Sequence, residues 1–515
     1  MWKRLFLAIA LVLCTSVAGH AADLRIGLSS FTTSVDPLFY VGGNNISMMR
    51  NMFDCLMNQD EKQQIKPGLA VSWKPLDDTT WELKMRTGVT FHDGSAFTSE
   101  DAAASIKRVA LASVNSPSSL MAYVQDIESV ETPDAETLII KTKKPTPLLP
   151  NNLSRISILP AECAELTTND LNAGKGVIGT GPFKFVSWAP DEHVTLAKNP
   201  DYWGGAPEWD TVVYRSLKSN SARVAAILAG DVDVIENVPS ADNEQLRKNS
   251  KLRVISTPSN RVMYLHMDQD REVSPHAAGP DGKNPLLNPK VRRAISLSIN
   301  RQALIDRVMD GQGGLAGQLV PEGYFGYSPD IKVDPYDPDQ AKKLLAEAGY
   351  PNGFTLTSHA SNDRYPNDAK VAQAVGQMLS RIGIKVSVET LPGSVYFSRA
   401  SKLEFSFIMG GAAVETGEAT GVLGPLLATY SQTTGQGNRG RYSNPAFDNA
   451  LQTALVTVDD AAREKLLQQA MNIAMDDLGV IPLFFLSHNW AVRADLDIQP
   501  RTDGYTLAKF ITTTK

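Results

Sequence analysis

Residues 67–101 read PGLAVSWKPLDDTTWELKMRTGVTFHDGSAFTSED, and three kinds of local signal follow one another there. The segment WELKMR (81–86) alternates large apolar and polar side chains, which is the period of a half-buried strand. HDGS (92–95) predicts a tight turn in which Gly94 can take a positive φ. TSED (98–101) is typical of a helix start with acids in the first turn, and an Ala-rich segment follows it. The stretch therefore predicts strand, turn and helix in that order.

The exact order of residues in this stretch carries further information. Its order LA-x-SW, DD-x-T-x-E-L-K-x-R-x-G-V-x-FHDG and F-T-x-ED resembles the extracytoplasmic solute-binding proteins of peptide-type ABC importers, solute-binding family 5. GTGPFKF at 179–185 and NPDYWGG at 199–205 match the same family of dipeptide- and oligopeptide-binding proteins. The resemblance implies an α/β, type II periplasmic-binding-protein fold. In that fold two lobes meet at a hinge, and an extra small domain is inserted in the first lobe.

The chain divides into several expected parts. Its 515 residues exceed what one hydrophobic core usually supports, so length alone predicts at least two domains. Strand and helix patterns alternate after residue 267, which predicts an α/β lobe. With the resemblance, we expect a signal peptide at 1–21, a first lobe at 22–57, 176–266 and 486–515, an inserted small domain at 58–175, and a second lobe at 267–485.

The N-terminus has the layout of a cleaved secretory signal. Two basic residues precede an apolar run at 5–17, and Gly-His-Ala at 19–21 is a small-x-small cleavage site. The run is too short for a stable membrane span, and Leu13 before Cys14 does not fit a lipoprotein signal. We expect cleavage near Ala21 and a periplasmic protein; a buried N-terminal helix is the alternative.

Charge and cysteine content limit the possible partners. Cleavage of the signal would leave 48 basic and 56 acidic residues, a formal charge of −8. An acidic surface argues against nucleic acid or anionic lipid as the main partner. The mature cysteines, Cys55 and Cys163, can form at most one disulfide and no metal cluster. We expect two separately buried thiols, with a disulfide as the open alternative.

Common enzyme motifs are absent from the sequence. There is no Walker phosphate loop, HExxH, CxxC or GxSxG motif. GQGGLA at 311–316 has the letters of a dinucleotide loop but follows a predicted helix, so we interpret it as a helix end. His92 and Asp93 are interpreted as a turn rather than as a metal or acid–base pair. We therefore expect no enzyme, no cofactor and no metal site.

The segment NDRYP (362–366) is the main candidate ligand site. It lies between a predicted strand, FTLTSH, and a predicted helix that starts near Asp368. A cation at the C-terminal end of a strand faces the crevice where α/β lobes bind ligands. In the family, the arginine of a similar Arg-Pro-Tyr segment holds the ligand carboxylate, and Arg364 with Tyr365 is the matching position. The alternative is a surface Arg364 paired with Asp363 or Asp368.

The resemblance also implies an acid that binds the amino group of the ligand. The family usually has Gly-Trp followed shortly by Asp, whereas this chain has MGGAAVETGEA at 409–419. Glu415 is nearest to the acid, and Gly411 or Ala412 replaces the Trp, so a ligand other than a dipeptide stays open. A solvated loop acid is the alternative for Glu415. Gly43 is expected to approach the ligand through its backbone, as glycine permits.

These expectations favour a binding protein. The resemblance implies that it captures a small peptide or peptide-like solute between its lobes, and we expect it to deliver the solute, as a monomer, to ABC permease subunits with cytoplasmic ATPases. Within the same fold, the alternatives are an opine or sugar conjugate, an oligosaccharide or a nickel chelate. A secreted hydrolase is the alternative from another class, although no nucleophile or acid–base pair with supporting context is present.

Four further elements follow from local patterns. Apolar residues at helical spacing predict a helix over 46–57. The segment 288–308 predicts one helix that starts near Pro289 and has an apolar face. The segment 337–349 predicts a helix that begins with Asp-Pro and ends at a glycine. IPLFF at 481–485 predicts a buried strand.

Overall fold

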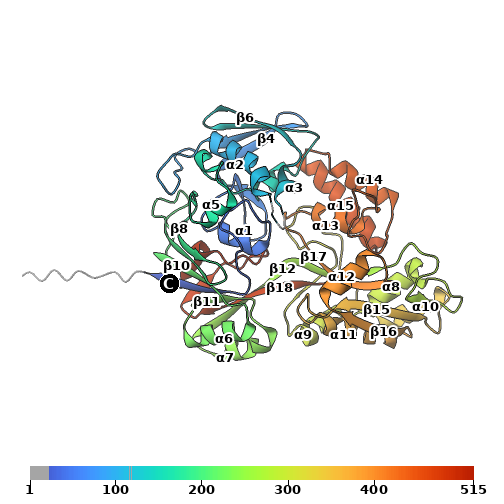
Figure 1. The fold of residues 1–515 in the computed structure, drawn as a ribbon. Coiled ribbons are helices and arrows are strands. Elements are labelled where there is room, and N and C mark those ends of the chain that lie inside the picture. Colours follow the sequence, from blue (N-terminus) through green and yellow to red (C-terminus); the bar gives the residue numbers. More distant parts are fainter. Residues whose placement is uncertain (1–21, 115, 117–118, 515) are drawn as a thin grey trace, which may run out of the picture.

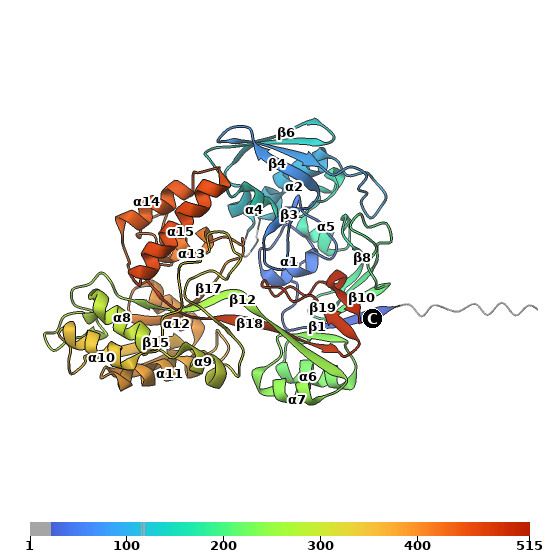
Figure 2. The ribbon, with the colours of Figure 1, turned by 180° about the vertical axis from the view of Figure 1, so that it is seen from behind.

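The protein is described by a computed structural model that covers residues 22–114, 116 and 119–514. Within those residues, one 12-stranded sheet extends through two lobes. Its long antiparallel strands β12 (Leu252–Met267) and β18 (Ile481–Arg493) run side by side from one lobe to the other (Figure 1). The view from behind shows the same two strands between the lobes (Figure 2). The expected α/β fold is confirmed, while the expected signal peptide lies outside the described residues.

The first lobe contains the half of the large sheet that begins with β1 (Asp23–Leu28). This strand lies between two parallel neighbours, β10 (Thr211–Ser216) and β11 (Val234–Glu236). Leu24 and Ile26 are buried, as is usual for a strand inside a parallel sheet. The other elements of this half are β9 (His193–Lys198), β8 (Phe183–Ala189), α1 (Gly43–Met49), α6 (Asn220–Ala229), α7 (Asn243–Lys248) and the 3-10 helix η2 (Ser240–Asp242).

The second lobe contains the other half of the sheet. β17 (Phe407–Ala413) is antiparallel to β12, and β15 (Thr355–Ser361) is parallel to β16 (Lys385–Leu391). Helix α11 (Asp368–Arg381) connects β15 with β16, because a parallel pair needs a crossover. The other elements are β13 (Ala277–Ala278), β14 (Gly314–Leu315), η3 (Pro285–Leu287), α8 (Pro289–Ser298), α9 (Arg301–Val308), α10 (Pro338–Glu347), α12 (Gly393–Ser401), α13 (Thr420–Leu427), α14 (Pro445–Ala454) and α15 (Asp460–Asp476).

A separate four-stranded antiparallel sheet lies above the first lobe in Figure 1. Its strand order is β4-β5-β7-β6, and α2 packs against β6 and β7. These elements are β4 (Ala70–Pro75), β5 (Thr80–Met85), β6 (Ile127–Asp134), β7 (Thr137–Thr142) and α2 (Ser99–Ala112). Around them lie β2 (Met57–Gln59), β3 (Ile65–Pro67), α3 (Met121–Val124), α4 (Leu149–Leu153), η1 (Ala161–Cys163) and α5 (Thr168–Asn172). The chain ends with β19 (Leu496–Ile498), η4 (Ala508–Phe510) and β20 (Ile511–Thr513).

The opening stretch of the sequence folds as predicted. In β5, Trp81, Leu83 and Met85 are buried and alternate with more exposed residues. Gly94 has a φ of 92° in the turn. The Asp101 carboxylate accepts the backbone N–H of the N-cap residue of α2 at 2.8 Å. Local chemistry is therefore sufficient to specify these three elements.

The HDG turn has a structural role. The ring Nε2 of His92 lies 3.0 Å from the carbonyl oxygen of Gly181, and its Nδ1 accepts the backbone N–H of Gly179 at 3.3 Å. Burial lowers the pKa of His92, so the ring is neutral near pH 7. The contact joins the turn to the GTGPFKF segment, so two motifs that are distant in the sequence meet in the fold.

Two helix predictions are wrong in extent. The helix predicted over 46–57 is α1 alone, because the apolar residues that follow it enter the core as turns and as β2. The single helix predicted over 288–308 is two helices, α8 and α9. Between them the Asn300 side chain accepts the backbone N–H of Ala303 at 2.9 Å and starts a new helix as its N-cap.

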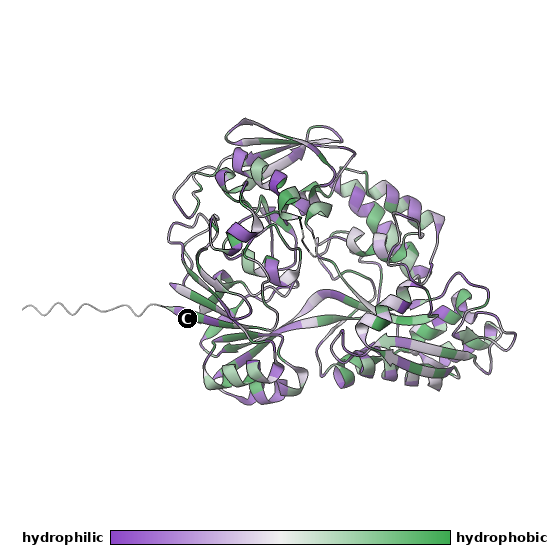
Figure 3. Ribbon diagram, viewed as in Figure 1, coloured by the Kyte–Doolittle hydropathy of each residue, from purple (hydrophilic) through white to green (hydrophobic). Residues whose placement is uncertain are grey.

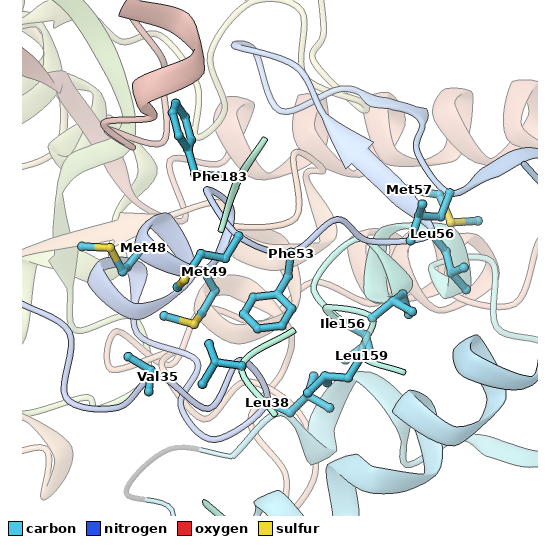
Figure 4. Packing of buried hydrophobic residues seen from close by; sticks show 14 of the residues in the cluster. Val35, Leu38, Met48, Met49, Phe53, Leu56, Met57, Ile156, Leu159 and Phe183 are labelled. Atoms are coloured by element: carbon cyan, nitrogen blue, oxygen red, sulfur yellow. The ribbon is translucent and has the colours of Figure 1, made fainter. Parts of the chain in front are cut away.

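One hydrophobic core joins the first lobe to the inserted domain. Helices of both lobes carry hydrophobic and hydrophilic residues on different sides (Figure 3). Figure 4 shows Phe53 close to Met49 and Leu38, with Leu159 beside Leu38. The same cluster continues into β5 and β7 of the inserted domain. We therefore expect the first lobe and the inserted domain to move together.

The two cysteines in the described part of the chain are separate. Cys55 and Cys163 are both buried, and neither is in a disulfide, which confirms the prediction of two separately buried thiols. The described residues contain no group of three or more His, Cys, Asp or Glu side chains that could hold a metal ion. No helix in the described part of the chain is long and apolar enough to cross a membrane.

His266 on β12 is expected to make stability depend on pH. Its side chain is 1% exposed, and burial, with a smaller effect of the Arg439 charge, lowers its pKa to about 3. Below the ordinary histidine pKa the unfolded chain binds a proton that the folded protein does not. Stability therefore falls as the pH decreases from neutrality, by about 1.4 kcal/mol per pH unit for one such group. Thermal unfolding between pH 7 and pH 5 measures this, and His266→Gln should show a shallower slope; equal slopes would contradict the assignment.

Candidate ligand-binding site

The NDRYP segment connects β15 with α11, as predicted. β15 ends at Ser361, and α11 begins at Asp368, whose carboxylate is buried. This carboxylate accepts the Ser361 hydroxyl at 2.7 Å and the backbone N–H groups of Arg364 and Tyr365 at 3.1 and 3.2 Å. Asp368 therefore fixes the backbone of the two residues that we expect to bind ligand.

The Arg364 side chain is exposed and has no charged partner. Within the described residues, its guanidinium group makes no ion pair or hydrogen bond, and its central carbon lies 5.1 Å from the centre of the Tyr365 ring. The neighbouring acids are engaged elsewhere, since Asp363 accepts the backbone N–H of Gly393 at 2.7 Å and Asp368 holds the loop. The structure thus lacks the ion pair with Asp363 or Asp368 that the alternative interpretation requires.

Tyr365 packs against β17. Its hydroxyl donates to the carbonyl oxygen of Gly411 at 3.1 Å, and the side chain is buried. A Cβ atom on Gly411 would lie 3.0 Å from a carbon of the Tyr365 ring and 2.8 Å from the sulfur of Met263. Position 411 therefore has no room for the tryptophan that is usual in the family. The next residue, Ala412, packs against a different hydrophobic cluster.

Glu415 lies just beyond the end of β17 and contacts the inserted domain. Its side chain is 43% exposed, and its Oε2 lies 3.8 Å from Nη2 of Arg155, whose side chain is 1% exposed. Its backbone carbonyl accepts the Gln63 side-chain amide at 2.9 Å. A separation of 3.8 Å is longer than a direct charge-assisted hydrogen bond, so the carboxylate keeps the capacity to bind a second cation.

Gly43 approaches the same region from the first lobe. Arg155 donates from Nη1 to the hydroxyl oxygen of Tyr505 at 3.2 Å. Burial raises the pKa of Tyr505 to about 12, so the phenol is neutral and its proton is available for a ligand. A Cβ atom on Gly43 would lie 3.7 Å from the Tyr505 ring. The structure therefore brings Gly43 and Glu415 to one pair of side chains, Arg155 and Tyr505, which the sequence did not indicate.

β17 has one edge that other strands leave open. β12 pairs along one side of it, whereas β15 reaches the other side only at Ile408. The backbone N–H of Val414 bonds to the carbonyl of Asn260 on the β12 side. Because the backbone groups of successive residues point to opposite edges, those of Gly411 and Ala413 face this side, where the Gly411 carbonyl already accepts the Tyr365 hydroxyl. Tyr365 lies near the start of this open edge, and Glu415 follows its end.

A nearby cavity is distinct from these residues. It has a volume of about 580 Å³ and lies between the inserted domain and the second lobe, with Trp73, Trp81 and Phe325 in its wall. None of the four residues predicted to bind ligand lines it. We place the candidate site at Arg364, Glu415 and the open edge of β17, and not in this cavity. Two lobes enclose a ligand only when they close on it, so an enclosed cavity is not a requirement for the site before closure.

Known proteins share both this sequence and this fold. Residues 64–434 match the family described as bacterial extracellular solute-binding proteins, family 5. The chain belongs to this family. The glutathione-binding protein GsiB of Pectobacterium atrosepticum is 31% identical over 489 residues, which cover 92% of this chain and 90% of the relative.

Two solved structures of other proteins are similar to this chain in sequence and in fold. The periplasmic binding protein DppA of Helicobacter pylori, associated with an ABC transporter and in complex with the peptide STSA, is 26% identical. It covers 96% of this chain and 99% of its own, with a TM-score of 0.71. AgaA of A. tumefaciens R10, in complex with agropinic acid, is 26% identical, covers 96% of this chain and 99% of its own, and has a TM-score of 0.69.

The family 5 assignment confirms the resemblance drawn from the opening stretch. The chain has the type II periplasmic-binding-protein fold and is the solute-binding component of an ABC importer. The family is described as extracellular, and DppA is described as a periplasmic binding protein that is associated with an ABC transporter. The assignment places the chain in solute transport.

Proposed function

We propose that this family 5 protein binds a short peptide or peptide-like solute that has a free carboxylate and a free ammonium group. The observation that carries the proposal is the unpaired Arg364 guanidinium at one end of the open β17 edge and the half-exposed Glu415 carboxylate at the other. Four residue steps, from Gly411 to Glu415, span roughly 13 Å at the rise of a strand. That length suits an extended ligand of three or four residues.

Each element of the site has a matching ligand group. Arg364 receives the carboxylate through parallel hydrogen bonds, and Tyr365 holds its own position on β17. The backbone groups of Ala413, which is half-buried, bind the ligand backbone as an added strand. Glu415 binds the ammonium group, while Gly43 contacts the ligand through its backbone. The neutral hydroxyl of Tyr505 lies beside Glu415 and Gly43 and donates a further hydrogen bond.

Glutathione is a candidate within this ligand class. Relatives of this chain are named glutathione-binding proteins, and glutathione is a tripeptide with an amino-acid head group at its γ-glutamyl end. A head group that carries both an ammonium and a carboxylate fits Glu415 and Arg155, which present both charges within 3.8 Å. An opine is the second candidate, because AgaA, 26% identical, is in complex with agropinic acid.

Ligand binding drives closure in this proposal. Arg364, Tyr365 and Glu415 belong to the second lobe, whereas Gly43 and Tyr505 belong to the first. A ligand that contacts both sets is bound more tightly when the lobes are closed, and only such a difference in affinity shifts an open–closed equilibrium. The solute then leaves unchanged to the permease.

Further parts of the proposal concern processing and organisation. We propose cleavage of residues 1–21 near Ala21, action in the periplasm as a monomer, and no catalytic activity or cofactor. The permease subunits and their cytoplasmic ATPases are the partners. The proposed domains are the first lobe at 22–57, 176–266 and 486–515, the inserted domain at 58–175, and the second lobe at 267–485. The shared core of the first lobe and the inserted domain supports two moving bodies.

Native mass spectrometry of the protein isolated from its own periplasm tests the ligand class. We expect a bound mass that corresponds to a short peptide or to glutathione. Calorimetry with that ligand, its N-acetyl form and its C-terminal amide then tests each charged end, and each modification should weaken binding at least tenfold. An opine would move the ligand assignment to the alternative. Release of cleaved ligand would overturn the binding-protein proposal.

A further inference from the structure

We infer that a second binding site, for a small oxyanion such as phosphate, lies between the first lobe and the inserted domain, beside the C-terminal segment. A cavity of about 200 Å³ lies there between α1, the β2–β3 hairpin and residues 501–510. Four cationic side chains from three segments line it, namely Arg50, Lys66, Arg501 and Lys509. Neither Arg364 nor Glu415 lines this cavity. The cavity therefore lies apart from the two charged residues of the proposed solute site and shares Tyr505 with it.

Two of the four cations already have a carboxylate partner. Lys66 lies 3.4 Å from Asp60, which also lines the cavity. Arg501 lies 2.6 Å from Asp503, and it also donates to the backbone carbonyl of Asp60 at 3.0 Å. These two pairs contribute little net charge.

The other two cations have no such partner. Within the described residues, Arg50 makes no ion pair and donates to the backbone carbonyl of Ser154. Lys509 makes no ion pair either, and its hydrogen bond, to the hydroxyl of Tyr202, is 3.5 Å long. An ammonium group has three donors, so most of its hydrogen-bonding capacity is unused.

Asp54 is the acid that could act as a counter-charge, but its carboxylate already accepts hydrogen bonds from other groups. Asp54 lines the cavity, and its carboxylate accepts the Thr180 hydroxyl at 3.0 Å, the Tyr202 hydroxyl at 3.2 Å and the Trp203 indole N–H at 2.8 Å. All three donors are neutral. Asp54 therefore balances at most one of the two unpaired cations, and it does so without direct contact.

The surroundings of Lys509 disfavour a charge without a direct counter-charge. Burial lowers the pKa of Lys509, the positive charges of Arg501 and Arg50 lower it further, and Asp54 opposes them. The rings of Tyr202 and Phe510 lie 5.7 and 4.9 Å from its nitrogen and offer cation–π contacts, which are weaker than a counter-charge. An anion in the cavity would supply the missing charge and the missing acceptors.

The volume and the donors indicate the class of anion. A water molecule occupies about 30 Å³ in the liquid, so the cavity has room for a tetrahedral oxyanion and its water. Guanidinium and ammonium groups together are the usual ligands of phosphate oxygens. Tyr505 also lines the cavity, so the source of the anion is either a free ion or an acidic group of the transported solute.

Calorimetric titration of inorganic phosphate into the mature protein, at low ionic strength and without solute, tests the site. We expect a dissociation constant in the millimolar range or below, at least tenfold weaker binding in Lys509→Met, and retained binding in Lys509→Arg. Lys248→Met is the matched control, because Lys248 is exposed, lies on α7 of the same lobe and pairs with Glu244. This control should bind phosphate as the wild type does.

Three results would overturn the inference. They are no phosphate binding by the wild type, equal binding by the folded Lys509→Met protein, and loss of phosphate binding in Arg364→Glu, which would place the anion in the solute site. If Lys509→Met does not fold, Arg50→Met takes its place in the same comparison. Phosphate binding that persists when the solute is saturating indicates a free ion, and competition with an acidic solute but not a neutral one indicates that the solute supplies the anion.

Discussion

Replacement of Arg364 by glutamate is expected to weaken the binding of a carboxylate-ended ligand at least about 100-fold, with little change in the thermal unfolding midpoint. Each hydrogen bond to a charged group contributes roughly 1.5–3 kcal/mol, and the new carboxylate adds repulsion. Stability should be retained because the Arg364 guanidinium is exposed and makes no ion pair or hydrogen bond within the described residues. Calorimetry for affinity and thermal unfolding for stability measure the two effects separately.

Matched variants make this test specific. Lys370→Glu changes the charge by the same amount at an exposed position on α11 and should leave affinity unchanged. A C-terminal amide of the ligand should bind to Arg364→Glu about as well as to the wild type, since the lost group no longer has a partner. Glu415→Gln should instead remove the preference for a free amine. If Arg364→Glu binds the carboxylate-ended ligand with wild-type affinity, Arg364 does not belong to the site.

Arg108→Met is expected to have the largest effect on stability, a loss of about 3–5 kcal/mol. Arg108 on α2 forms two hydrogen bonds of 2.8 Å to the Asp36 carboxylate, and both side chains are fully buried. Asp36 also accepts the Thr168 hydroxyl at 2.7 Å. Removal of the guanidinium leaves a carboxylate that is buried without its counter-charge. Chemical unfolding, followed by a probe in each lobe because the chain has several domains, measures the change.

The partner variant separates the charge from the packing. Asp36→Asn in the Arg108→Met background removes the uncompensated charge, so the double variant should recover at least half of the lost stability. Lys248→Met is the control for an exposed pair, 74% and 81% exposed with Glu244, and should change stability by less than about 1 kcal/mol. A loss of similar size in the double variant would show that packing, and not charge, is responsible.

The sequence was sufficient where a structure depends on nearby residues. The strand, turn and capped helix of the opening stretch follow from side-chain alternation, from a glycine with positive φ and from an acid three residues after the N-cap. The position of Arg364 and Tyr365 between a strand and a helix also follows from local patterns. The break at Asn300 could have been recognised, since asparagine is a common N-cap.

Other features needed the tertiary structure. No local signal marks Arg155 or Tyr505, which are 350 residues apart in the sequence and 3.2 Å apart in space. The lack of room at Gly411 depends on the ring of Tyr365, which lies between β15 and α11, and on the sulfur of Met263, which lies on β12. The missing counter-charge at Lys509 is visible only when the nearby Asp54 carboxylate is seen to be engaged with other donors.

From its sequence alone, this protein could be assigned to its family and fold, and four candidate ligand contacts, Arg364, Tyr365, Glu415 and Gly43, could be proposed. These depend on short segments whose hydrogen bonds and apolar periodicity are local. The open edge of β17, the contact of Glu415 with Arg155 and the cation-lined cavity were decided only by the tertiary structure. The physical reason is that burial and charge balance are set by residues which are distant in the chain and become neighbours when the lobes fold.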